Sequence, residues 1–166
     1  MKKIMFLLLF IIGSFALAFE SHSLEFKKEI YEMITQIEEY PESPENNAKW
    51  QKILRFAIED EEATVYLIGG ILGDEKTDKF DDDTRSALVM SYTMGALKDQ
   101  LISDKEITQE ESTQNGLKAA VKTYKRLKKS KGINIKFYEL LIEYDTYDIS
   151  ILQKMEFEKL LNDSRK

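Results

Sequence analysis

The chain contains no cysteine and only one histidine among its 166 residues. Without cysteine there is no disulfide, no thiolate metal ligand and no thiol nucleophile. The single histidine, His22, lies close to the N-terminus, where chains are commonly poorly ordered. We therefore expect neither a Ser–His–Asp triad nor a histidine-based zinc or di-iron site. The glycines also form no phosphate loop, so the sequence predicts no metal and no cofactor.

Positively charged residues are fewer than negatively charged ones. The chain has 24 lysines and arginines and 30 aspartates and glutamates, which gives a formal net charge of −6. A net acidic protein is a poor general binder of nucleic acid. We expect a soluble protein or one that docks on a basic partner, with no nucleic-acid ligand.

The N-terminus has the features of a signal peptide. Lys2 and Lys3 precede an apolar run from Ile4 to Phe15, and Ala16-Leu17-Ala18 fits the small-x-small pattern of a cleavage site. An uncleaved membrane anchor is the alternative, but the run is shorter than the ~20 residues that a spanning helix needs. We predict a cleaved signal peptide over 1–18, a single helical domain over 19–166, and export to the periplasm or beyond.

Residues 84–103 are predicted to form the central helix of the domain. Between Ala87 and Leu97 the segment has no charged residue, and its apolar residues cover every side of a helix. A helix of this kind is buried. Asp82 or Asp83 should cap its N-terminus. We predict an all-α fold, a compact single-domain bundle of six or seven helices around this one.

The remaining helices follow from 3.6-residue apolar spacing. They are expected over 23–40, 44–72, 108–130 and 137–144, with a last helix after Asp148. Thr108 and Glu111 form a capping-box pattern, and Gly132 should end that helix. Over 44–72 the sequence allows one long helix or a break near Asp60, and we favour the break. The buried stripe of this segment is predicted to be Trp50, Ile53, Leu54, Ala57 and Ile58.

A basic stretch is the most unusual surface feature. Eight lysines and arginines and no acid lie between Ser112 and Tyr138. Lys118, Lys122, Lys125 and Lys129 fall on one helix face and are candidate residues for binding an anion or a partner. The alternatives are an ordinary solvated face or a face packed near the acidic loop of the same molecule.

Tyr138, Tyr144 and Tyr147 are a second candidate partner surface, because tyrosine is enriched at protein interfaces. The alternative is a place in the core with the hydroxyl at the rim, which we expect for at least two of the three.

Two acidic clusters are candidate chemical sites. Glu59, Asp60, Glu61 and Glu62 could supply the acid and base of a hydrolase, or form a solvated helix junction. The acidic loop over 74–83 offers oxygen ligands to calcium, but it lacks the EF-hand spacing, and helix capping explains its acids equally well.

Together these features predict an exported, non-enzymatic binding protein of the bacterial envelope, acting as an inhibitor, an immunity-like protein or a scaffold. Its expected partner is an envelope protein, and peripheral contact with membrane or cell-wall polymer is possible. An alternative is a carrier that holds a small apolar ligand between helices near Met90, Met94 and Gly95. A carboxylate-pair hydrolase is the less favoured third hypothesis.

Overall fold

The computed structural model describes residues 23–60, 63–68, 71, 78, 80–103, 105–151 and 154. Across these ranges the regular secondary structure is entirely helical, which confirms the predicted all-α fold. The elements are α2 (Leu24–Ile37), the 3₁₀ turn η1 (Pro44–Asn46), α3 (Asn47–Glu59), α4 (Asp82–Ile102), α5 (Gln109–Lys131) and α6 (Lys136–Glu143).

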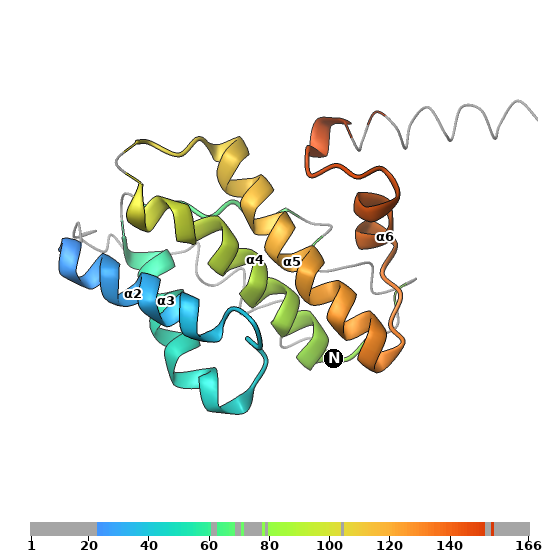
Figure 1. The fold of residues 1–166 in the computed structure, drawn as a ribbon, viewed down its shortest axis with the longest axis horizontal. Coiled ribbons are helices and arrows are strands. Elements are labelled where there is room, and N and C mark those ends of the chain that lie inside the picture. The colour runs from blue at the N-terminus through green and yellow to red at the C-terminus, as the bar shows by residue number, and fades with distance from the viewer. Residues whose placement is uncertain are drawn as a thin grey trace, which may run out of the picture.

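Helix α4 lies between two hydrophobic cores, and this explains why its sequence is apolar on every side. With α5 and α6 it forms the tyrosine core, in which Tyr92, Tyr124 and Tyr138 are fully buried. With α2 and α3 it forms the aliphatic core. Figure 1 shows α4 running through the middle of the molecule, with α5 beside it. The aliphatic core consists of Ile30, Ile34, Ile37, Ile53, Phe56, Ala63, Met94, Leu97 and Leu101. The prediction of a bundle built round a central helix is confirmed.

Small residues allow α4 and α5 to pack closely. A Cβ atom added at Gly95 would lie 2.6 Å from the Ala119 Cβ and from the Asn115 carbonyl oxygen. A Cβ at Gly116 would lie 2.7 Å from the Tyr92 ring. The Ser91 and Thr123 hydroxyls are hydrogen bonded to each other at 2.7 Å across the same contact. Both glycines are therefore explained by the approach of the two helices.

The ends of α4 and α5 are fixed by capping groups. Asp81 caps α4, and its carboxylate accepts a 2.7 Å hydrogen bond from the Thr84 N–H, so the predicted caps at Asp82 or Asp83 are displaced by one or two residues. At α5, Thr108 and Glu111 form the predicted capping box. Gly132 ends α5 in the left-handed conformation, with φ +68°, which glycine adopts without a Cβ penalty.

The segment over 44–72 breaks where a break was favoured. Helix α3 ends at Glu59, Asp60 is extended, and residues 63–68 are not helical. The predicted stripe on α3 is partly wrong. Ile53 and Phe56 are buried, whereas Leu54 and Ile58 are exposed. The buried side of α3 is centred on Ile53 and Phe56, so it is rotated about the helix axis relative to the predicted stripe.

Side chains from the helices hold the non-helical segment after α3 in place. The Gln100 amide accepts from the Thr64 N–H and donates to the Thr64 carbonyl, both at 3.0 Å. The Tyr92 hydroxyl donates to the Tyr66 carbonyl, and the Tyr138 hydroxyl donates to the Ile71 carbonyl at 3.2 Å. The tyrosine core thus supplies hydrogen bonds that replace those of a regular helix.

Several predictions lie outside the described residues. They are the signal peptide over 1–18 and most of the last helix, although Asp148 accepts hydrogen bonds from the Ser150 and Ile151 N–H groups as an N-cap would. None of the helices in the described ranges has both the length and the apolar run needed to cross a bilayer.

Candidate functional site

The four predicted lysines form a continuous row on α5, which we call the lysine row: Lys118, Lys122, Lys125 and Lys129. Their spacing of four, three and four residues follows the helix period, so the row is roughly 16 Å long at 1.5 Å per residue. All four side chains are exposed. The opposite side of α5 is buried in the tyrosine core, which turns the row towards solvent.

The other basic residues of α5 have acidic partners within the molecule. Arg126 makes a bidentate ion pair with Glu42, with one hydrogen bond of 2.7 Å, and its guanidinium lies 5.1 Å from the centre of the Tyr40 ring. Lys128 pairs with Glu139 at 2.6 Å. Lys131 pairs with Asp81 at 3.0 Å. These contacts join α5 to the α2–η1 connection, to α6 and to the start of α4.

These partners lower the pKa values of three carboxyl groups. Burial raises the pKa of Glu42, but the hydrogen bond and charge of Arg126 outweigh it, so the net shift is downward. Glu139 follows the same pattern, with Lys128 and Tyr124 as its donors. The pKa of Asp81 falls to about 2, chiefly through its hydrogen bonds from Thr84 and then through Lys131. All three acids are therefore ionised at neutral pH.

The lysine row has no such partners within the part of the chain that the structure describes. In the ranges that the structure describes, none of its four lysines forms an ion pair. The Lys118 ammonium lies 6.0 Å from the centre of the Tyr147 ring. The basic stretch thus divides into residues that hold the fold together and a row that remains open.

The three candidate tyrosines do not form a surface together. Tyr138 is fully buried, and its ring stacks on Tyr124 at 4.9 Å between ring centres. It cannot contact a partner, and of the two alternatives the core position, expected for at least two of the three tyrosines, is the one that Tyr138 takes. Tyr144 and Tyr147 are partly buried and pack against the tyrosine core. The short connection after α6 turns them back towards the core, with Asp145 at φ 47°.

The acidic candidates have structural contacts where they are described. Glu59 pairs with Arg55 at 2.9 Å. Asp60 is buried and accepts a 2.9 Å hydrogen bond from the Ala63 N–H. Glu61 and Glu62 lie outside the described residues, as does much of the loop over 74–83. Of that loop, Asp78 accepts from the Lys136 N–H at 3.3 Å and Asp81 caps α4.

The geometry near Met94 and Gly95 gives little room for a carried ligand. The space beside these residues has a volume of about 50 Å³, whereas small-molecule sites have roughly 300–1,000 Å³. Gly95 is needed for the close approach of α4 and α5. The helix contact accounts for this glycine without a ligand.

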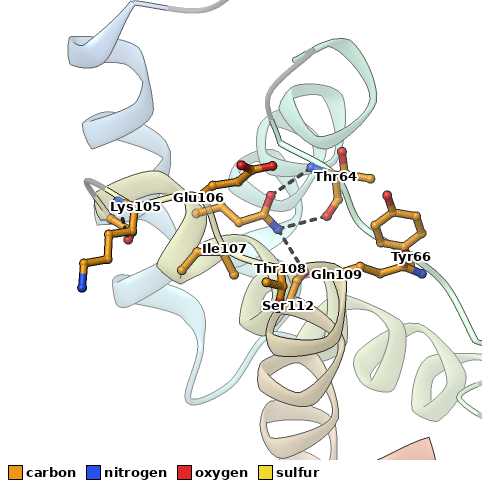
Figure 2. Close-up of a pocket in the computed structure, with 10 residues that line it drawn as sticks. Thr64, Tyr66, Lys105, Glu106, Ile107, Thr108, Gln109 and Ser112 are labelled. Carbon is orange, nitrogen blue, oxygen red and sulfur yellow. Dashed lines mark hydrogen bonds between the residues drawn. The ribbon is translucent and has the colours of Figure 1, made fainter.

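A polar hollow that the sequence did not indicate lies between residues 64–66 and the turn from α4 to α5 (Figure 2). Its volume is about 410 Å³. Figure 2 shows Thr64 and Tyr66 on the segment after α3, Thr108, Gln109 and Ser112 at the start of α5, and the Lys105 ammonium pointing away. No motif indicated this hollow, because the side chains come from three segments and are of ordinary types.

Comparison with known proteins does not identify a relative of this chain, so its function must be inferred from the fold and the surfaces described above. No protein-family model, no curated protein and no solved structure matches the chain.

Proposed function

We propose that the chain is an exported, non-enzymatic binding protein of the bacterial envelope, and that the lysine row docks an acidic surface of a partner protein. The observation that supports this is the absence of acidic partners for the row among the described residues of a chain that has 30 acids. Three neighbouring basic residues on the same helix do find acids. Carboxylates of this chain can therefore reach α5 and form ion pairs with its basic residues.

A protein partner fits the row better than a lipid surface does. Helices that lie on membranes place large apolar residues beside their lysines. The exposed residues of α5 in the described structure include no large apolar side chain. The row is a line of four charges about three helical turns long. It matches a helix or strand edge of a partner that carries acids at similar spacing. Such complementary charges favour rapid and specific association.

The test uses two variants with the same change in charge. The row variant carries Lys118→Gln, Lys122→Gln, Lys125→Gln and Lys129→Gln. The control carries Lys28→Gln, Lys49→Gln, Lys105→Gln and Lys154→Gln, at positions outside the row that form no ion pair in the described ranges.

Residues 19–166 of each form are immobilised, exposed to envelope extract and eluted with rising salt. We expect one stoichiometric protein to elute with salt from the wild type and the control, and to be at least tenfold depleted on the row variant. Equal recovery from the row variant would contradict docking by the row. An empty wild-type column would contradict a stable envelope partner.

A further inference from the structure

We propose that the polar hollow of Figure 2 and a neighbouring hollow together bind a linear, uncharged oligosaccharide. The neighbouring hollow has a volume of about 490 Å³. Gln109 lines both, so a chain-like ligand that crosses this residue would occupy the two. Both volumes are in the range of small-molecule sites, roughly 300–1,000 Å³. No residue of the lysine row is among the described lining residues of either hollow, although the Lys118 ammonium lies 6.0 Å from the centre of the Tyr147 ring.

The walls of the two hollows include a segment whose backbone is held by side-chain hydrogen bonds. Thr64, Tyr66 and Ile68, three alternate residues of the segment after α3, line them on one side. Gln100 fixes the backbone of Thr64, and the Tyr92 hydroxyl holds the Tyr66 carbonyl. The first turns of α5 form the facing side. A site held in this way loses little conformational entropy when a ligand binds.

The hydrogen-bonding groups suit sugar hydroxyls. A sugar hydroxyl donates and accepts, and it is best matched by hydroxyl and amide side chains, which also do both. The Tyr66 and Tyr147 hydroxyls and the Gln109 amide have no hydrogen-bond partner in the part of the chain that the structure describes. A ligand can therefore reach the Tyr66 hydroxyl in the first hollow, the Tyr147 hydroxyl in the second, and the Gln109 amide in both.

Each hollow also contains one tyrosine ring, Tyr66 in the first and Tyr147 in the second. The flat face of an aromatic ring is apolar with partial negative charge, and it packs well against the C–H groups on the face of a pyranose. Tyr66 is 42% exposed, so its ring is accessible. Two rings separated by a polar residue fit a ligand with repeated apolar faces and hydroxyl edges.

The charges around the hollows favour an uncharged ligand. Glu110 and Asp148 line the second hollow, and their carboxylates can accept from neighbouring sugar hydroxyls while repelling anions. The Lys105 ammonium points away from the first hollow (Figure 2). The Thr108–Glu111 capping box already occupies donors at the start of α5. A phosphate or carboxylate ligand would therefore lie beside carboxylates, and the one cation among the described lining residues points away from it.

An extended peptide is the competing ligand. Peptide grooves obtain specificity from apolar pockets that accept alternate side chains. Among the described lining residues, the aliphatic side chains are Ile107 in the first hollow and Ile68 and Ile149 in the second, and polar residues are more numerous. The lining therefore favours a polyhydroxylated chain.

The experiment is an NMR titration of ¹⁵N-labelled protein comprising residues 19–166 with chitotetraose, maltotetraose and cellotetraose. We expect at least one of these probes at millimolar concentration to shift amide signals over 64–68, 105–114 and 147–150 and to leave those of α2 unchanged. Gln109→Ala and Tyr66→Ala should each weaken binding at least tenfold. Gln51→Ala and Tyr40→Ala, at exposed positions outside the hollows, should leave it unchanged.

Three results would overturn the proposal. The first is that none of the three oligosaccharides shifts these signals. The second is that an uncharged blocked tetrapeptide shifts them while the sugars do not, which would identify a peptide site. The third is that sugar-induced shifts persist unchanged in the Gln109→Ala and Tyr66→Ala proteins, which would place binding elsewhere.

Discussion

The basic residues of α5 form two sets, which are both positively charged but have different surroundings. Arg126, Lys128 and Lys131 lie next to acids from other parts of the chain, and they connect α5 to its neighbours. The lysine row is on the outer side of the helix and has no acid partner among the described residues. The difference shows that the number of charges in a basic stretch does not reveal which residues stabilise the fold and which are open to a partner. The positions of their acidic partners must also be known. The first set should affect stability when changed, and the second should affect binding.

The largest effect on stability is expected from Arg126→Ala. Arg126 and Glu42 are each less than one-third exposed in their side chains, and removing the arginine leaves a partly buried carboxylate without its donors. A hydrogen bond to a charged group contributes about 1.5–3 kcal/mol, and solvent screening of this partly exposed pair reduces the sum of its two bonds. We therefore expect a total loss of about 1.5–3 kcal/mol in the free energy of unfolding, measured by urea denaturation.

The neighbouring residue provides the control for this prediction. Lys125 is exposed and belongs to the lysine row, so Lys125→Ala should change stability by no more than about 0.5 kcal/mol. Similar losses in the two variants would show that the two sets of basic residues do not differ in the way proposed.

A smaller effect is expected from Asp81→Asn, and it should depend on pH. The pKa of Asp81 is lowered from 3.8 to about 2. Between these values the unfolded chain binds the proton and the folded protein does not, so the stability from this group is present above pH 3.8 and is lost as pH falls towards 2. Asparagine still caps the helix, so the variant removes mainly the charge that pairs with Lys131.

The measurement is the melting temperature of both proteins from pH 6 down to 2, followed by circular dichroism. The wild type should be the more stable near pH 5, and the difference should narrow as the pH decreases below 3.8 towards about 2. A difference that is constant with pH would mean that the Asp81 charge does not contribute.

The smallest effect on stability is expected from Lys128→Ala. Its pair with Glu139 is more exposed than that of Arg126, at 42% and 32% for the two side chains, and such pairs contribute about 0–1 kcal/mol. The pKa of Glu139 should nevertheless rise, because burial raises it and Lys128 is one of the groups that lowers it. A carboxyl-detected NMR titration checks this, and an unchanged pKa would contradict the pairing.

Much of the helical architecture could be predicted because local signals were strong. The charge-free segment around Ala87–Leu97 predicted α4 as the central helix, and the Thr108–Glu111 box and Gly132 predicted both ends of α5. The exposed row on α5 followed from its spacing alone. These features depend on residues close together in the sequence.

The features that could not be predicted depend on contacts between distant segments. A core position is expected for at least two of the three candidate tyrosines, but the residues near Tyr138 do not indicate which two. They also do not indicate that its hydroxyl bonds to Ile71, 67 residues away. Leu54 and Ile58 have the spacing of a buried stripe, and their exposure depends on how α3 packs against α2 and α4. The division of the basic residues also could not be predicted, because Glu42 is 84 residues from Arg126.

The most direct test of the central claim is lysine reactivity towards an amine-acylating reagent, measured residue by residue by mass spectrometry. In the isolated protein Lys118, Lys122, Lys125 and Lys129 should react faster than Lys128 and Lys131, which are held in ion pairs. In the presence of the captured partner the row should become protected while Lys28 and Lys49 stay reactive. Uniform reactivity in the free protein, or protection that spares the row, would contradict the account.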